Sequence, residues 1–586
     1  MNGLIDTLEG KVKAAFKAEG LDEDLGTVRR ADRPDLADYQ CNGALAAAKA
    51  AKTNPRALAE RLVSHLPVDE VIAGVEIAGP GFINLKLTAA ALATRAQEIA
   101  QDHRAGAETV EPRKVIIDFG GPNIAKPMHV GHLRSSIIGD SLQRLFRFLG
   151  DEVTSDIHMG DWGLPMGMLI TELRREQPDL PYFNPQYDGD YPSHSPVTLE
   201  DLERMYPAAA AACKADEERA TEARQLTADL QSGHPGYRAL WQHFLAVTRQ
   251  ALDREFSDLG VSFSIWMGES DVDPLIGPMI QDLKDFGIVI EDQGAQVIPV
   301  AEPGEEPGLP PLILQKRDGG VLYGTTDLAT IIDRARRFRP DLILYVVDQR
   351  QADHFKQVFR AAEKANIMAQ SALEHIGFGT MNGTDGKPFK TRAGGVMKLH
   401  DLISQAKDKA RERLHEGGLG AELSQDEFED VAHKVAIAAI KFADLQNWRA
   451  SNYIFDLDRF MTFEGKTGPY LLYQAVRAKA LLRKANTTLE DAAKAAIAIT
   501  EPAERDLVML LDGFSDVLHG AYDKRAPHVL AEHVYGLAQA FSKFYAACPI
   551  LQDPEKTPSR LALVAATLRQ LTVGLDLLGL DIPDRM

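Results

Sequence analysis

The hydrophobic positions change their spacing along the chain, and each spacing predicts a different element. Residues 115–119, VIIDF, form a short continuous apolar run, which is typical of a strand buried on both faces of a parallel sheet. After the loop GGPN, apolar residues recur every three or four positions from Leu133 to Leu149, and Gly150 follows as a stop signal. The pattern therefore predicts a strand, a loop and a helix in succession.

The same alternation returns further along the chain. Residues 152–160, EVTSDIHMG, predict a second strand, residues 327–340 predict a helix, and DLILYVVD at 341–348 predicts another buried strand. Strands that alternate with helices indicate βαβ units, and hence a Rossmann-type α/β core with a parallel sheet. Residues at about 172–270 differ, because a Pro- and Asp-rich loop precedes a polar helical run, so we interpret them as an insertion in this core.

Two further regions flank the predicted core. Residues 1–110 combine amphipathic helix patterns with a β-like run at 75–87 that is broken by a Gly-Pro-Gly turn, which predicts a small α+β domain. From 435 to 586 nearly all apolar residues keep a helical period, which predicts an all-α bundle. The core with its insertion then covers residues 111–434.

Composition and charge narrow the class of protein. With 586 residues, 45% of them hydrophobic and 26% charged, the chain is expected to form roughly three or four soluble globular domains. The three cysteines are far apart and form no CxxC pair, and no signal peptide or spanning run is evident, so we expect a cytoplasmic protein without disulfides. The net charge of -20 argues against indiscriminate binding of nucleic acid, so any such partner must meet local basic patches.

The residues PNIAKPMHVGH, 122–132, stand where the first core helix begins. Ligands of open parallel sheets bind beyond the carboxyl ends of the strands, where a helix N-terminus presents free N–H groups to phosphate. His129 and His132 can donate imidazole N–H groups, Gly131 allows a close approach, and Lys126 adds a cation. An isolated HxxH can equally be a capping pair or half of a metal site, but no third metal ligand is evident, so no metal site is expected.

A second candidate lies much later, in the loop GTDGKPFKTRAGG. Basic side chains stand among glycines there, which is typical of a loop that closes over a polyphosphate, although a solvated basic turn has the same composition. The basic residues of this loop are Lys387, Lys390 and Arg392.

Together, an HIGH-like motif at the start of a Rossmann helix and a later KMSKS-like loop resemble the class I aminoacyl-tRNA synthetases, and more narrowly the arginyl-tRNA synthetases. The matching segments are AGPGFIN, PNIAKPMHVGHLRSSIIGD, HMGDWGLPMGML, WMGES, RDGGVLYGTTDLA, DGKPFKTRAGG, FEGKTGPYLLYQAVRA and LLGLDIPDRM. They run in family order and cover most of the chain. The loop departs from the pattern, since it reads PFKTR rather than KMSKS, and in this family Lys126 is thought to supply the missing charge.

The resemblance implies a two-step reaction. The carboxylate of L-arginine attacks the α-phosphorus of ATP, giving arginyl-adenylate and pyrophosphate, and the terminal ribose 2′-hydroxyl of tRNA(Arg) then accepts the arginyl group, giving arginyl-tRNA and AMP. Mg²⁺ is expected to accompany ATP, with no tightly bound cofactor. The implied catalytic residues are Lys126, His129, His132, Lys387, Lys390 and Arg392, and the implied ATP-binding residues are Pro122, Asn123, His129, Gly131, His132 and Lys390.

Recognition of arginine calls for acids, because a guanidinium is a planar fork that pairs best with carboxylates. The positions that match the family are Asp118, Asn123, His132, Tyr323, Asp327 and Gln351. Taken alone, Asp327 in the first turn of a helix is typical of a capping residue. A site that hydrogen-bonds a guanidinium rejects lysine and aliphatic analogues strongly, so we expect no editing step.

Contacts to tRNA are expected in both flanking regions. The resemblance implies that the helical bundle grips the anticodon loop, where Tyr470, Tyr473 and Arg477 combine stacking surfaces with a cation; a solvated amphipathic face with core aromatics is the alternative. The N-terminal domain is implied to contact the tRNA corner near the D-loop, and the candidate residues are Tyr39, Gln40 and Asn42. A monomer is expected.

Two rival functions stay open on the sequence. A smaller nucleotidylyltransferase also uses HxGH on this fold, but it explains neither the flanking domains nor the acids. A catalytically silent tRNA-binding paralogue is disfavoured because Lys126, His129, His132 and the basic loop occur together.

Overall fold

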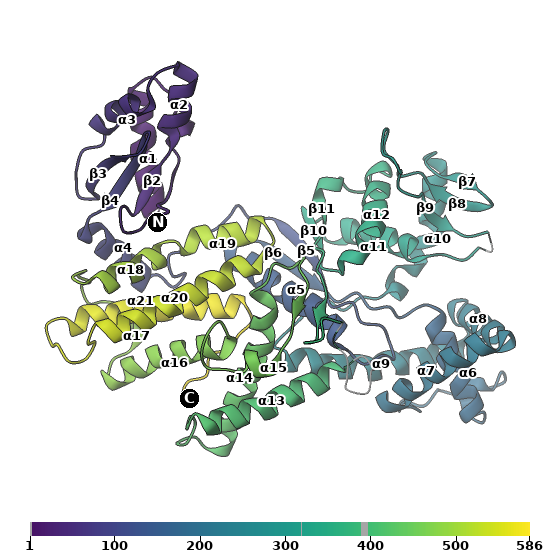
Figure 1. The fold of residues 1–586 in the computed structure, drawn as a ribbon. Coiled ribbons are helices and arrows are strands. Elements are labelled where there is room, and N and C mark those ends of the chain that lie inside the picture. The colour runs from purple at the N-terminus through teal and green to yellow at the C-terminus, as the bar shows by residue number, and fades with distance from the viewer. Residues whose placement is uncertain (1–2, 318, 388, 390–396) are drawn as a thin grey trace.

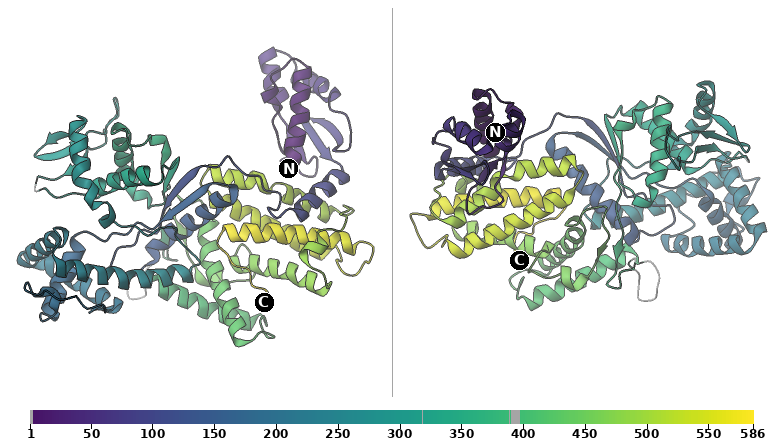
Figure 2. Two further views of the ribbon diagram at one scale, coloured as in Figure 1. Left: turned by 180° about the vertical axis from the view of Figure 1, so that it is seen from behind. Right: turned by 45° about the horizontal axis from the view of Figure 1, so that its top comes forward.

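The computed structural model describes residues 3–317, 319–387, 389 and 397–586. A parallel-sheet core lies between a helical bundle and a group of inserted helices, and a small N-terminal domain stands at the far end of the bundle (Figures 1 and 2). This arrangement confirms the predicted fold class: a Rossmann-type core with an insertion, a small α+β N-terminal domain and an all-α C-terminal bundle. Within the described part of the chain, no helix combines the length and apolarity needed to cross a membrane.

The N-terminal domain packs helices on a four-stranded antiparallel sheet of order β1-β2-β4-β3. Its elements are α1 (Leu4–Ala18), η1 (Glu23–Gly26), β1 (Val28–Arg30), β2 (Tyr39–Cys41), α2 (Gly43–Ala51), α3 (Pro55–Ser64), β3 (Ile72–Ala78), β4 (Phe82–Leu87) and the following α4 (Ala89–Gln101). The predicted Gly-Pro-Gly turn joins β3 to β4, and Gly79 and Gly81 take the positive φ values that glycine permits.

The core sheet is parallel throughout, with the order β11-β10-β5-β6. Its strands and the helix between the first two are β5 (Lys114–Asp118), α5 (Val130–Leu149), β6 (Glu152–Asp156), β10 (Leu342–Tyr345) and β11 (Leu373–His375). The three predicted strands correspond to β5, β6 and β10. In register, Tyr345 pairs with Asp118 and Asp118 with Asp156, so these three residues stand side by side at the carboxyl edge of the sheet.

Two groups of elements separate β6 from β10. The first group, called the inserted helices below, is α6 (Leu164–Glu176), η2 (Pro181–Phe183), α7 (Leu199–Ala215), α8 (Glu217–Gln231) and α9 (Pro235–Asp258). The second is α10 (Glu269–Asp285), β7 (Ile290–Asp292), β8 (Ala295–Ile298), β9 (Leu312–Gln315) and α11 (Tyr323–Arg337). After β10 come η3 (Gln349–Gln351), α12 (Ala352–Lys364), η4 (Gln370–Ala372) and, after β11, β12 (Met381–Asn382), which pairs with β13 (Tyr453–Ile454).

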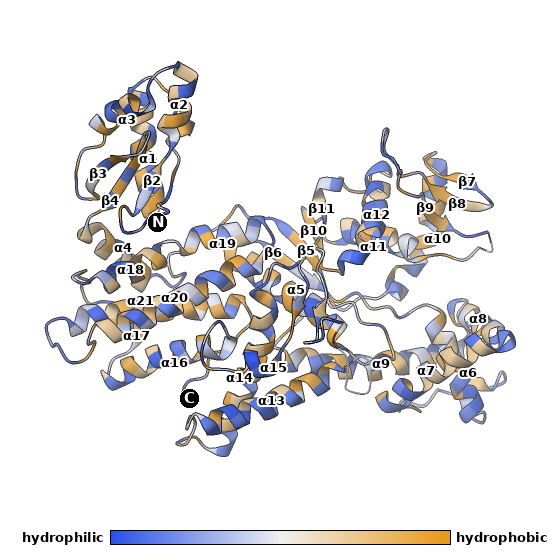
Figure 3. Ribbon diagram, in the orientation of Figure 1, coloured by the Kyte–Doolittle hydropathy of each residue, from blue (hydrophilic) through white to orange (hydrophobic). Residues whose placement is uncertain are grey.

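The C-terminal helices form the bundle and hold α5 from one side. They are α13 (Leu399–Glu416), α14 (Gln425–Leu445), α15 (Leu457–Phe460), α16 (Gly468–Lys484), α17 (Leu489–Ala492), α18 (Pro502–Asp512), α19 (Phe514–Asp523), α20 (Pro527–Ala547) and α21 (Thr557–Leu577). Hydrophobic and hydrophilic residues alternate along them, as in amphipathic helices (Figure 3). Arg134 of α5 forms a buried ion pair with Asp444 of α14, 2.9 Å between Nε and Oδ2, so the helix that begins at HVGH is tied to the bundle.

Candidate active site

The two histidines of HVGH cap the N-terminus of α5 reciprocally. His129 is the N-cap, and its Nδ1 accepts a hydrogen bond from the Gly131 amide at 3.0 Å, while the Nδ1 of His132 accepts one from the His129 amide at 3.2 Å. A Cβ on Gly131 would lie 2.6 Å from the His129 ring, so a side chain here would displace that imidazole. The capping interpretation and the ligand-binding interpretation of these histidines are therefore compatible.

Both imidazoles are neutral at pH 7 in this environment. Burial, followed by the charge of Lys126, lowers the pKa of His129, and burial together with His129 and Lys126 lowers the pKa of His132 to about 3. A neutral imidazole whose Nδ1 accepts a hydrogen bond carries its proton on Nε2. The start of α5 therefore presents two Nε2–H donors at the positive end of the helix dipole, which is a suitable arrangement for binding phosphate.

A cavity of about 240 Å³ opens directly beside this helix start. The lining residues include His129, Gly131, Phe378, Gly379 and Met381. Glycine backbone and apolar side chains form most of its wall, so a flat aromatic group can lie against it. This cavity joins the start of α5 to a surface suited to a nucleobase.

A second cavity, of about 420 Å³, borders the loop that precedes α5 at Asn123. Its lining includes Asn123, Trp162, Glu269, Tyr323 and Thr326. Burial, reinforced by the negative charges of Asp161 and Asp327, raises the pKa of Glu269 to about 7. A carboxylate in this state gains most from a cation, so the cavity is suited to a positively charged ligand.

Asp118 lies in a different environment from the one predicted for an arginine-binding acid. It is 8% exposed, and its Oδ2 accepts a hydrogen bond at 2.6 Å from Nη2 of Arg334, which also donates to Asp156 at 2.7 Å. Asp118, Asp156 and His158 are close enough to share a metal ion, but the guanidinium of Arg334 already stands between the two carboxylates. The protein's own arginine is thus paired with both acids.

Of the remaining predicted arginine-binding residues, three lie at or near the second cavity and Gln351 lines neither cavity. Tyr323 and Asn123 line the second cavity, and Asp327, one turn after Tyr323 on α11, accepts a hydrogen bond at 2.5 Å from the Nε2 of His354 on α12. Gln351 is exposed in η3 and is not among the residues that line either cavity.

The predicted phosphate-contacting residues are described only in part. Pro122 is buried, and its carbonyl accepts a hydrogen bond from the Gly160 amide. Lys387 is exposed, and its amide donates to Asp385. Lys390 and Arg392 lie outside the described residues.

The aromatic and basic residues predicted on the bundle come together on α16. The guanidinium of Arg477 lies 4.8 Å from the ring centre of Tyr473 and 4.9 Å from that of Tyr545 on α20. Tyr470 is half-buried and packs edge-on against Tyr535. Arg477 thus lies between two tyrosine rings, one of which, Tyr545, is 43% exposed.

In the N-terminal domain, Tyr39 does not face solvent. It is 1% exposed, and its hydroxyl donates at 2.8 Å to Asp512 of the bundle, where Arg95 also binds. The expectation that the Tyr39 side chain contacts tRNA is therefore wrong: its ring is part of the contact between the N-terminal domain and the bundle. Gln40 and Asn42 are half-buried, and Gln40 donates to Asn84 at 2.8 Å.

Sequence reasoning missed several residues of this site. Glu269 belongs to the matched segment WMGES, where an acid directly after a glycine at a helix start was the available signal. His354 and Tyr545 had no such signal, because each gains its partner only through packing of α12 on α11 or of α20 on α16.

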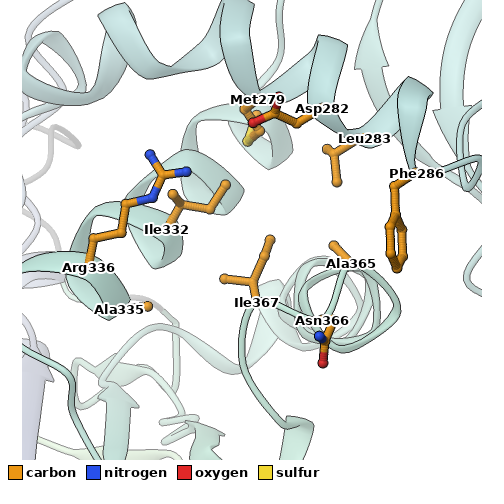
Figure 4. Close-up of a pocket in the computed structure, with 10 residues that line it drawn as sticks. All are labelled: Met279, Asp282, Leu283, Phe286, Ile332, Ala335, Arg336, Ala365, Asn366 and Ile367. Carbon is orange, nitrogen blue, oxygen red and sulfur yellow. The ribbon is translucent and has the colours of Figure 1, made fainter.

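A further cavity, of about 380 Å³, shares no lining residue with the two cavities described above. It lies between the C-terminal halves of α10 and α11 and the residues that follow α12. Figure 4 shows Phe286 and Arg336 on opposite sides of it. None of the predicted site residues lines it. Its position excludes it from the candidate active site.

Comparison with known families assigns each part of the chain. Residues 95–457 match the catalytic domain of class I (R) tRNA synthetases, residues 471–586 match the DALR anticodon binding domain, and residues 3–87 match the N-terminal domain of arginyl-tRNA synthetases. The first of these models alone covers more than half of the chain.

Relatives extend over the full length. The arginine–tRNA ligases of Maricaulis maris and Hyphomonas neptunium are 55% and 53% identical to this chain, and each match covers 100% of both proteins. In fold, the chain is similar to arginyl-tRNA synthetases from Plasmodium falciparum, with a TM-score of 0.83, and Thermus thermophilus, with a TM-score of 0.79; both are 24% identical with complete coverage of both chains. The chain therefore belongs to the arginine–tRNA ligase family of class I aminoacyl-tRNA synthetases.

Proposed function

We propose that this protein is an arginine–tRNA ligase, which activates L-arginine with ATP to arginyl-adenylate and pyrophosphate and transfers arginine to the 3′-terminal ribose of tRNA(Arg). The observation that carries the proposal is the position of the 122–132 segment. Asn123 lines the acidic cavity suited to a cation, whereas His129 and Gly131 line the cavity beside the phosphate-binding helix start. An arginine carboxylate and an ATP α-phosphate can therefore meet across one loop.

In this proposal the helix start binds the phosphates of ATP. His129 and His132 donate their Nε2–H groups to the charge that develops on the phosphates, and Lys126, Lys387, Lys390 and Arg392 supply cations. The chemistry requires positioning and charge stabilisation rather than a protein nucleophile. ATP carries Mg²⁺, whose ligands come mainly from the phosphates and water.

Arginine is proposed to bind with its guanidinium against the acids of the second cavity. We assign this role to Glu269, which lines the cavity, and to the nearby Asp327, whose charge helps to raise the pKa of Glu269. Tyr323 and Asn123 also line the cavity, and Asn123 is placed at the amino acid end of the substrate. The hydrogen bond from His354 fixes the orientation of the Asp327 carboxylate. Asp118 is assigned a positioning role, since its carboxylate is paired with Arg334.

The flanking domains are proposed to hold tRNA(Arg). Residues 435–586 bind the anticodon arm through Tyr470, Tyr473 and Arg477, and residues 1–110 meet the outer corner of the tRNA near the D-loop through Gln40 and Asn42. We further propose that the enzyme works as a cytoplasmic monomer.

Exchange of pyrophosphate into ATP tests the function directly. We expect exchange with arginine alone among the twenty amino acids, because a site built to hydrogen-bond a planar guanidinium rejects side chains that lack one, including the lysine ammonium. The assay is run with and without total tRNA, since activation that waits for tRNA is typical of this family. Absence of exchange with every amino acid under both conditions would leave a silent tRNA-binding paralogue as the better description.

Arginine binding is expected to strengthen about tenfold between pH 6 and pH 8. The pKa of Glu269 is raised to about 7, so its carboxyl is mostly protonated at pH 6 and mostly ionised at pH 8, while the guanidinium of arginine stays charged throughout. Affinity therefore rises with pH as Glu269 ionises. The Kd for arginine, measured calorimetrically at both pH values with saturating tRNA, checks this.

The variant Glu269→Gln separates this carboxyl from other titrating groups. It should bind arginine about 10- to 100-fold more weakly at pH 8, because one charged hydrogen-bond partner is lost, and its Kd should not change between pH 6 and pH 8. If the variant keeps the pH dependence of the wild type, another group is responsible.

A further inference from the structure

The inserted helices hold the loop that leads into HVGH. The amide of Ala125 donates to Oγ1 of Thr248 on α9 at 3.2 Å, in a buried position, and the amide of Met128 bonds the carboxylate of Glu255 on the same helix. Ala125 also has a φ of +62°, an unfavourable conformation for alanine that its surroundings must maintain. The backbone on both sides of Lys126 is thus fixed from outside the sheet.

The side chain of Lys126 is held by the same helices. Its Nζ lies 4.6 Å from the centre of the Tyr206 ring on α7, and among the described residues no acid forms an ion pair with it. A cation over the face of an aromatic ring is attracted electrostatically, yet it keeps its N–H groups free for another ligand. In this position the Lys126 charge still lowers the pKa of both His129 and His132, so the cation stands close to the phosphate-binding helix start.

Helix α7 is itself anchored to the other side of the site. Glu203, three residues before Tyr206, forms an ion pair at 2.6 Å with Lys398. The neighbouring residue Met397 accepts a hydrogen bond from the Val130 amide in the first turn of α5. Tyr206 therefore stands on a helix whose position relative to HVGH is fixed.

We propose that the inserted helices serve as a positioning platform for arginine activation, in which Tyr206 is the positioning residue that holds Lys126 ready for the phosphates of ATP. The inference rests on the proposed function. A lysine side chain has four rotatable bonds, so without the ring its ammonium spreads over many positions and reaches the transition state less often. Tyr206 does not touch the reacting atoms and acts only through Lys126.

The test compares pyrophosphate exchange in matched variants of the full-length protein, with arginine and saturating tRNA. Tyr206→Leu is expected to lower kcat about tenfold with little change in the KM for arginine. The reason is that the Lys126 ammonium stabilises the transition state and does not bind arginine. Tyr206→Phe keeps the ring face and should restore most of the rate. Tyr187→Leu changes a tyrosine of the same insertion whose hydroxyl bonds Asp190, and it should behave as the wild type.

A double-mutant cycle separates positioning from a merely structural role. In the Lys126→Met background, Tyr206→Leu should lower the kcat of exchange by less than about twofold, since the lysine on which the ring acts is already gone. An unchanged rate in Tyr206→Leu, or the same tenfold loss in both backgrounds, would overturn the inference. Should Tyr206→Leu fail to fold, Tyr206→Met takes its place in the cycle. Wild-type exchange with arginine is required throughout, so failure of the proposed function is distinguished from failure of this inference.

Discussion

Replacement of His132 by alanine is expected to reduce arginine-dependent pyrophosphate exchange by about 10²- to 10³-fold, the effect of removing one preorganised donor from a transition-state site. The imidazole is neutral, because its pKa is lowered to about 3, and its Nδ1 is occupied by the His129 amide. Its Nε2–H is therefore a fixed donor that needs no reorganisation when charge develops on the phosphates. The measurement is kcat of exchange at saturating ATP, arginine and tRNA.

Binding of tRNA provides the internal control for this variant. The affinity for tRNA(Arg), measured by filter binding, should stay within about twofold of the wild type, because the proposed tRNA contacts lie on the flanking domains. His415→Ala, which removes an exposed histidine on α13, is the matched substitution and should leave both quantities unchanged. Full exchange activity in His132→Ala would contradict the assignment of this imidazole to the phosphates.

The parts of the fold that follow local rules were predictable from the sequence. The run VIIDF and the three- to four-residue spacing from Leu133 to Leu149 became β5 and α5, because burial on two faces and helical period are properties of short windows. The position of the α5 start beside a cavity also followed, since a parallel sheet places its helix N-termini at the carboxyl edge of the strands.

Contacts between distant segments were not predictable in the same way. The acids Asp118 and Asp327 look equivalent in sequence, yet Asp118 is paired with Arg334, 216 residues away, while Asp327 is bonded by His354 near the second cavity. Likewise, nothing near Tyr39 shows that its hydroxyl bonds Asp512 of the bundle. Which polar group is already satisfied within the protein depends on packing, and only unsatisfied groups remain for a ligand.

The pairing of Arg334 with Asp118 and Asp156 predicts a large effect on the stability of the core. Arg334→Met should destabilise the core by about 3–5 kcal/mol, because it removes the cation that pairs with both buried carboxylates, Asp118 and Asp156, and leaves the imidazole of His158 beside Asp156. Arg334 is 0% exposed, and although burial alone would lower its pKa, the two acids keep it raised, so the guanidinium is charged in the folded state. The loss is measured as the shift of the urea unfolding transition followed by tryptophan fluorescence. Arg337→Met, one turn later and half-exposed beside Asp333, should cost no more than about 1 kcal/mol.

The pH dependence of this loss identifies its cause. Burial already raises the pKa of Asp118 although Arg334 lowers it, so loss of Arg334 raises this pKa further above the unfolded value of about 4 and folding takes up a proton. Such a group favours the folded state below its unfolded pKa, and that contribution disappears as pH rises through the folded pKa. The deficit of Arg334→Met should therefore be largest at pH 8 and shrink toward pH 5, whereas a deficit caused by lost packing would not change with pH. Replacing both acids as well, in Asp118→Asn/Asp156→Asn/Arg334→Met, should remove the pH dependence. A deficit that stays constant from pH 5 to pH 8 would show that Arg334 acts by filling space rather than by neutralising the carboxyl edge of the sheet.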